Sequence, residues 1–125
     1  MNKFKWTLFY IFFLSSISIC GGSKKTGIYS SMKYYPDTGD IGGMEIFVTY
    51  CSGGINGSYY VLFQKAEGAP STPQLVEANI WADSISFTIP QYGLFKGKIS
   101  QKELRGKFDS FKEIEILKRK KSYWQ

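Results

Sequence analysis

The chain contains no histidine, only two cysteines and only four prolines. Without histidine it lacks the commonest general base, the side chain that changes its charge near neutral pH and the commonest metal ligand. Serine–histidine–aspartate hydrolysis and histidine-bound zinc are therefore excluded. We expect no catalytic residue, no metal site, no cofactor and no enzymatic activity.

The composition supports one folded domain. The 125 residues are 43% hydrophobic, 18% aromatic and 21% charged, with a formal net charge of +6. A chain of this length has room for a single core of ordinary size, and its apolar content argues against disorder.

The first residues are typical of an export signal. Lys3 and Lys5 precede an apolar run at 6–14, and small and polar residues follow as far as Gly22. The run is short for a membrane-spanning helix, although a permanent anchor stays open as an alternative. We therefore expect an exported protein, periplasmic or secreted, that is either free or attached to the membrane.

The fate of Cys20 decides that of Cys51. The residues that follow Cys20, at 21–25, resemble the flexible tether that bacterial lipoproteins place after their acylated cysteine, although Ile19 departs from the small residue of that pattern. Cys20 is therefore a candidate for lipidation, which would leave Cys51 as a lone thiol. Alternatively, cleavage after Ser18 leaves both cysteines free to form a disulfide in an oxidising compartment.

Beyond Gly27 the chain consists of short segments rich in Ile, Val, Phe and Tyr, and clusters of Gly, Pro, Asn and Asp separate them. Their spacing of roughly 8–12 residues is typical of an all-β sandwich or barrel. The segments predict eight strands, at 27–35, 43–51, 58–65, 74–81, 84–90, 94–100, 103–108 and 112–118.

Alternation along the later strands separates a core face from a solvent face. Ile85, Phe87 and Ile89 share one side of their segment, and serine and threonine occupy the other. Gly97 and Gly106 fall at inward positions, where glycine usually marks a bend or a close approach of two backbones. We predict a single small eight-stranded antiparallel meander barrel, with a β-sandwich as the alternative. The domain boundaries are a signal at 1–22, a tether at 23–26, the barrel at 27–121 and an aromatic tail at 122–125.

The spacing of glycine and aromatic residues resembles that of the small lipocalin-like barrels of exported bacterial proteins. The features that carry it are Gly27-Ile28-Tyr29 and the Gly-x-Phe and Gly-x-Ile pairs of the late strands. The resemblance covers most of the mature chain, implies a barrel and transfers no functional residue.

Our first hypothesis for function is a barrel that holds a small apolar or aromatic ligand. A barrel of eight strands is just wide enough to be filled by its own side chains or to hold one such ligand. Gly97 and Gly106 would open space on adjacent strands. Tyr60, Gln64 and Trp81 would supply polar tips and a stacking face.

The alternative is an envelope interaction or inhibitor module with a solid core and a basic surface. Residues 94–125 hold ten basic and four acidic residues, whereas 21–93 hold four basic and six acidic ones. We expect this positive surface, together with a polar loop at 64–70, to bind an envelope protein, an anionic polymer or an anionic lipid surface rather than nucleic acid. Its residues are Lys96, Lys98, Arg105, Lys107, Lys118, Arg119, Lys120 and Lys121.

The aromatic tail allows two interpretations. Tyr123 and Trp124 directly follow the last basic run. They would either fold back to cover one end of the barrel or lie at a membrane interface, where tryptophan and tyrosine are enriched.

Overall fold

The computed structural model describes residues 19–21, 24–52 and 57–125, and these contain strands and turns but no helix. Most of the predicted export signal, at 1–18 and 22, lies outside the described residues. The strands are β1 (Ile19–Gly21), β2 (Gly27–Ser30), β3 (Lys33–Tyr35), β4 (Asp40–Ser52), β5 (Ser58–Pro70), β6 (Gln74–Trp81), β7 (Ser84–Ile89), β8 (Gly93–Ile99), β9 (Glu103–Phe108) and β10 (Glu115–Arg119).

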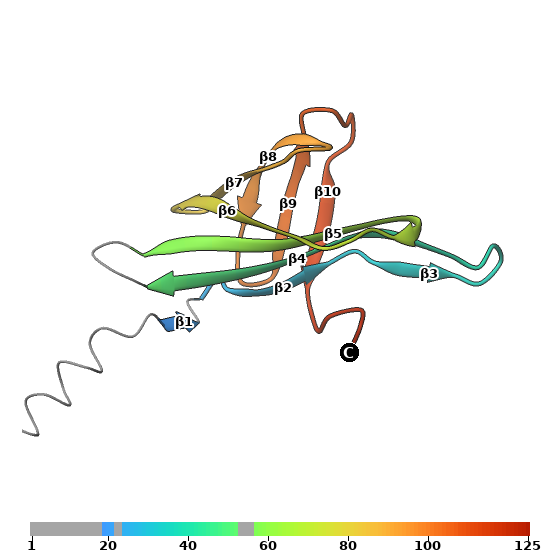
Figure 1. Ribbon diagram of the computed structural model, residues 1–125, viewed down its shortest axis with the longest axis horizontal. Coiled ribbons are helices and arrows are strands. Elements are labelled where there is room, and N and C mark those ends of the chain that lie inside the picture. Colours follow the sequence, from blue (N-terminus) through green and yellow to red (C-terminus); the bar gives the residue numbers. More distant parts are fainter. Residues whose placement is uncertain (1–18, 22–23, 53–56) are drawn as a thin grey trace, which may run out of the picture.

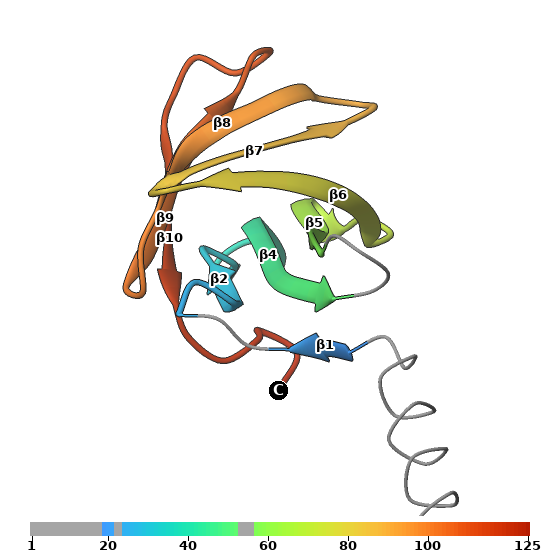
Figure 2. The same cartoon turned by 90° about the vertical axis from the view of Figure 1, so that its left-hand side faces the viewer.

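The predicted meander barrel is confirmed. Eight strands follow one another in the order β4-β2-β10-β9-β8-β7-β6-β5, and β5 pairs with β4 to close the ring. Every pairing is antiparallel, and the joint between first and last strands pairs Ser30 with Lys118 and Tyr29 with Arg119. Figure 2 shows the ring, in which β4 and β2 lie opposite β7 and β8. Closure leaves the barrel strands without the unpaired edges that make a sandwich prone to aggregation.

The strand predicted at 27–35 is broken in two. β2 and β3 both pair with β4, but the chain leaves the ladder at Ser31 and Met32. Gly43 of β4 faces the break with φ +99°, and a Cβ atom there would collide with the carbonyl oxygen of Ser31. The side chain of Ser31 occupies the gap, where its hydroxyl accepts a hydrogen bond from the Met44 amide at 3.1 Å.

The polar loop predicted at 64–70 is wrong, because these residues are the end of β5. They continue the ladder with β4, which runs from the Cys51–Ser58 pair to the Ile41–Gly68 pair. Together with β3 they form a hairpin end that extends beyond the other strands (Figure 1). Its polar side chains do not mark a loop. Glu67 is exposed and pairs at 2.5 Å with Lys65, whose side chain is only 15% exposed and whose ammonium group lies over the rings of Tyr92 and Phe111.

The interior of the barrel is packed with its own side chains. Phe108 lies at the centre of an aromatic cluster, with ring centroids 5.4 Å from Phe63, 5.2 Å from Phe95 and 6.0 Å from Phe87. Edge-to-face contacts of this kind stabilise a core beyond the burial of area alone. The fully buried set also contains Tyr29, Met44, Ile46, Val48, Val61, Ile85, Ile89, Ile99, Leu104 and Leu117.

Candidate functional site

The five residues predicted to line an interior pocket do not come together inside the barrel, although two of them, Trp81 and Gly97, line one hollow that opens on its outside. Tyr60 and Gln64 lie on β5 positions that alternate with the buried Val61 and Phe63, so they belong to the outer surface. Trp81 is also on the outside, with 85% of its surface exposed. The outward direction of these three side chains corrects the predicted pocket.

Gly97 and Gly106 do face inward, but they mark a close approach of two backbones. They are direct register partners in β8 and β9. A Cβ atom on Gly97 would lie 3.0 Å from the Cα atom of Gly106, and one on Gly106 would lie 2.8 Å from the ring of Phe95. The space that each glycine leaves is therefore already filled, as expected for strands that bend tightly around a small barrel.

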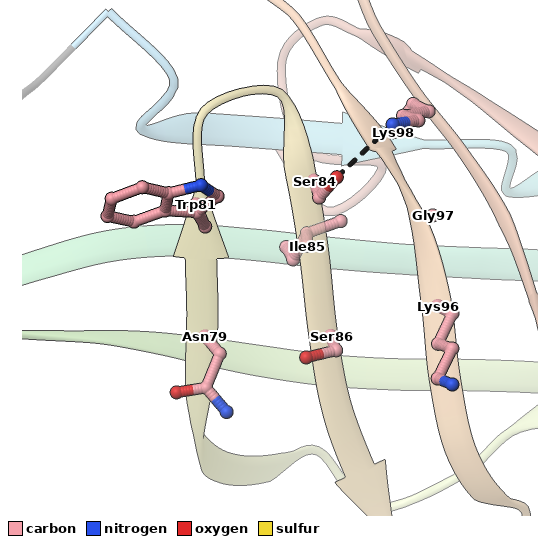
Figure 3. A pocket seen from close by; sticks show the side chains of 8 residues that line it. All are labelled: Asn79, Trp81, Ser84, Ile85, Ser86, Lys96, Gly97 and Lys98. Carbon is pink, nitrogen blue, oxygen red and sulfur yellow. Dashed lines mark hydrogen bonds between the residues drawn. The ribbon is translucent and has the colours of Figure 1, made fainter.

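A groove lies instead on the outer face of β6, β7 and β8 (Figure 3). Cross-strand register sets its side chains in two rows, one of Trp81, Ser84 and Lys98 and the other of Asn79, Ser86 and Lys96. The serines form a low floor because they are the smallest side chains of the six. We call this open hollow of about 510 Å³ the Trp81 groove.

Most polar groups of the Trp81 groove are available to a partner. Lys98 donates to Ser84 Oγ at 3.2 Å and forms an ion pair with Asp83 at 3.4 Å. Within the part of the chain that the structure describes, no side-chain hydrogen bond or ion pair engages Asn79, Ser86 or Lys96. An indole face, an amide, a hydroxyl and an ammonium group therefore border one hollow.

The positive charges predicted on neighbouring strands do share one outer face. Lys96 stands opposite Lys107, and Lys98 stands opposite Arg105, across the β8–β9 ladder. All four side chains are exposed. We call these four residues the basic quartet. Like charges directly opposite each other destabilise a sheet by roughly 0.2–1 kcal/mol per pair, so this arrangement has a cost in stability.

Carboxylates neutralise only part of this surface. Glu103 pairs with Arg105 at 3.2 Å and with Lys118 at 2.9 Å. The hydrogen bond from Lys118 is the main cause that holds the pKa of the Glu103 carboxyl below its usual value. Desolvation opposes this effect, and the positive charges of Arg105 and Lys118 add to it. Lys107 donates to the carbonyl oxygen of Phe111 at 3.1 Å. Lys120 and Lys121, which follow β10, are exposed.

The position of Arg119 differs from the prediction. Its guanidinium lies at one end of the barrel, where it donates to the carbonyl oxygens of Lys24 at 2.8 Å, Thr26 at 2.6 Å and Gln101 at 3.4 Å. Because β10 alternates, Arg119 falls on the same side of its strand as the buried Leu117. Arg119 is therefore a structural clamp rather than part of an anion-binding surface.

Tyr29 closes the same end. Its hydroxyl lies 2.8 Å from the carbonyl oxygens of both Lys25 and Ser100. Burial raises the pKa of the Tyr29 phenol above its usual 10.0, and the charge of Arg119 partly opposes this rise. The residues at 24–26, which the sequence suggested as a free tether, are thus held against the barrel end.

The tail folds back onto the barrel, but onto its side rather than its end. Trp124 Nε1 donates to Gln64 Oε1 at 2.7 Å, and the Tyr123 amide donates to Glu45 Oε2 at 3.3 Å. Arg119 and Tyr29 already close one barrel end, and Tyr92 and Phe111 pack against the core at the other. The tail contacts the outer face of β4 and β5 instead.

This tail-covered face is apolar. Ile28, Phe47, Leu62 and Leu75 form one continuous cross-strand row over β2, β4, β5 and β6. Trp124 lines a hollow of about 270 Å³ with three of them, Ile28, Phe47 and Leu62. Partial burial of these side chains beneath the Trp124 indole stabilises the docked tail through the hydrophobic effect.

Cys51 forms a disulfide. Its register partner in β1 is residue 20, the other cysteine of the chain. Lipidation of Cys20, which stays a prediction, is incompatible with a disulfide at Cys51 within the chain, because the chain has no third cysteine. The intact mass of the protein, expressed with its own N-terminus, distinguishes the two.

Neither a metal site nor a membrane-spanning helix is found in the described part of the chain. No group of three or more Cys, Asp or Glu side chains there is arranged to hold a metal ion. No helix in these ranges is long and apolar enough to cross a bilayer. In comparisons with known proteins, no family model, curated protein or solved structure matches the chain.

Proposed function

We propose that this protein is a non-enzymatic binding module of the envelope or the cell exterior, and that it binds an anionic partner on the basic quartet. The partner lies on the outside of a barrel whose own side chains fill its interior. Of the two hypotheses drawn from the sequence, this is the interaction module rather than the small-ligand carrier.

The observation that carries the proposal is the pairing of like charges across β8 and β9. Lys96 faces Lys107 and Lys98 faces Arg105, so two repulsive pairs lie side by side on one sheet. A solubilising surface does not require this, because alternating signs keep a protein soluble and also stabilise the sheet. An anionic partner would offset the repulsion and would be attracted by the combined field of the four cations.

The neighbouring carboxylates leave the centre of this surface positive. Glu103 and Asp83 pair with Arg105 and Lys98 at its margin, at 3.2 and 3.4 Å. Lys96 and Lys107 have no carboxylate partner among the described residues. The Lys96–Lys107 pair is therefore the part of the quartet that a bound anion would stabilise most.

The Lys96→Glu variant tests the proposal. Glutamate opposite Lys107 turns a repulsive pair into an attractive one, so we expect the free energy of unfolding to rise by about 0.5 kcal/mol. Affinity for a flexible polyanion such as polyphosphate should fall about tenfold, or about 1.4 kcal/mol. Urea unfolding and titration calorimetry at low salt measure the two effects, and added salt should weaken binding by the wild type.

Lys33→Glu is the matched control. It makes the same change of charge on β3, in the hairpin end, where Lys33 pairs with Gly42. Its affinity should stay within twofold of the wild type. An equal loss in both variants would mean that net charge rather than the quartet governs binding, and the proposal would then be wrong.

A further inference from the structure

We infer that the Trp81 groove binds an acidic sugar residue, which makes the anionic partner an acidic polysaccharide. This inference rests on the proposed function and names the class of its partner. In the bound state the indole of Trp81 packs against the flat C–H face of a pyranose ring. Lys96 pairs with the sugar carboxylate, and Asn79 and Ser86 hydrogen-bond to ring hydroxyls.

The dimensions of the groove suit one sugar ring. Its residues lie on three consecutive strands, and neighbouring strands are about 4.8 Å apart, so the groove is about 10 Å across. Its two rows are two residues apart along each strand, which adds about 7 Å in the other direction. One hexose ring with its carboxylate and hydroxyl groups covers such an area.

The groove combines an apolar aromatic face with hydrogen-bonding groups, as the binding of a sugar requires. Trp81 is 85% exposed, whereas large aromatic side chains are usually well buried. Beside it lie the side chains of Asn79 and Ser86, which lack a partner within the described residues. A pyranose ring has an apolar face and a polar rim, so it can satisfy the indole and these hydrogen-bonding groups together.

The charged part of the groove continues into the basic quartet. Lys96 belongs to both, and Lys107 stands directly beyond it in β9. A polymer with one carboxylate on each sugar could therefore place one ring on Trp81 and its next charges along the quartet. Several weak contacts along one chain then add to a useful affinity.

Two other classes of partner fit the groove less well. Proteins that bind single-stranded nucleic acid use several aromatic platforms along one channel, whereas Trp81 is the one aromatic residue among those that line this hollow. A lipid surface favours a contiguous apolar patch. Here serine and asparagine surround the indole (Figure 3).

The test compares two polyanions on the Trp81→Ala variant. Polygalacturonate supplies pyranose rings with carboxylates, and polyphosphate supplies charge without a ring. We expect affinity for polygalacturonate to fall about tenfold, since the indole face loses an apolar contact on the order of 50 Å². Affinity for polyphosphate should stay within twofold, because the basic quartet is intact. Trp81→Phe should restore most of the affinity for polygalacturonate.

Leu75→Ala is the matched control, because Leu75 is also exposed on β6 but lies outside the groove. It should bind both polymers like the wild type. In an NMR titration of the wild type, polygalacturonate should shift the indole N–H signal of Trp81 and leave that of Trp124 unchanged.

The outcomes separate the inference from the proposed function. If Trp81→Ala binds both polymers like the wild type, the sugar site is wrong and the quartet remains the anion site. If the wild type binds neither polymer, both are wrong. If oligothymidylate binds more tightly than polygalacturonate and loses affinity in Trp81→Ala, the partner is a nucleic acid and the inference is overturned.

Discussion

Two faces on opposite sides of the barrel each carry an exposed tryptophan, and only one of these faces is contacted by the C-terminal tail. On the β4–β5 side the tail places Trp124 over an apolar row and hydrogen-bonds it to Gln64 at 2.7 Å. On the β6–β8 side Trp81 stands over serines and beside lysines. Trp124 is 53% exposed and Trp81 is 85% exposed.

The two faces differ in how well they tolerate contact with water. An apolar row that faces water favours association with other proteins, and the tail reduces this risk by covering part of the row, in which Phe47 and Leu62 stay 40% exposed. The Trp81 groove is polar enough to stay solvated without a cover. The covered face therefore serves stability, and the open face is the one available for binding.

Two cations differ in a similar way: Arg119 is bonded to backbone carbonyl groups at one barrel end, whereas Lys98 lies on the open face. Arg119→Met removes the clamp on the carbonyl oxygens of Lys24, Thr26 and Gln101. Hydrogen bonds from a charged donor are among the stronger ones, so we expect a loss of about 2 kcal/mol in the free energy of unfolding, measured by urea denaturation. Polyanion affinity should be unchanged at temperatures where the variant is folded.

Lys98→Met is the comparison on the open side. Lys98 pairs with an exposed carboxylate, and exposed pairs contribute little, so its stability should stay within about 0.5 kcal/mol of the wild type. If both variants lose equal stability, the distinction between a structural cation at the barrel end and a surface cation on the open face is wrong.

Deletion of residues 122–125 tests whether the tail stabilises the barrel by packing on the apolar row. It removes the contacts of Trp124 with the apolar row and the hydrogen bond from Tyr123 to Glu45. We expect a loss of about 1 kcal/mol, since part of the buried apolar area is offset by the entropy of a released tail. Binding of a fluorescent hydrophobic dye should rise. In Trp81→Ala, by contrast, neither stability nor dye binding should change appreciably.

A deletion that leaves stability and dye binding unchanged but abolishes association with anionic liposomes would contradict this assignment. The tail would then be a membrane anchor, the alternative that the sequence left open.

Much of the fold could be predicted from the sequence, because local signals specify it. Turn residues mark the strand ends, and the alternation of Ile85, Phe87 and Ile89 with serine and threonine gives the core face of β7. The predictions were wrong where pairing with a strand distant in the sequence determines the local structure. Residues 64–70 have the composition of a loop, but pairing with β4 holds most of them as a strand.

Less of the candidate site could be predicted from the sequence. The outward direction of Lys96 and Lys98 followed from alternation, but their neighbours depend on cross-strand register. Only the register brings Asn79 and Ser86 beside Lys96. Conversely, Arg119 belongs to the same run as Lys118, and nothing local distinguishes the residue that turns to the barrel end. In the sequence, Gly97 and Gly106 are compatible with either a pocket or a close approach of two backbones. Their pairing with each other across β8 and β9 is needed to distinguish the two.

The smallest effect concerns the turn that follows Trp81. Ala82 has φ 53°, a left-handed conformation that costs a residue with a Cβ atom roughly 1–2 kcal/mol. Glycine removes this strain but loses more entropy on folding, by about 0.4–1 kcal/mol. We expect Ala82→Gly to raise the free energy of unfolding by about 0.5 kcal/mol.

The reverse change at Gly39 is the matched control for that experiment. Gly39 has φ +75° and no neighbouring atom within 4 Å of an added Cβ, so Gly39→Ala tests the backbone alone and should destabilise the protein by a similar amount. Polygalacturonate binding should be the same in Ala82→Gly as in the wild type, because strand register rather than turn strain positions Trp81. A loss of affinity in the stabilised variant would instead show that the strained turn holds the indole over the groove, so that the open face, unlike the covered one, gives up stability for binding.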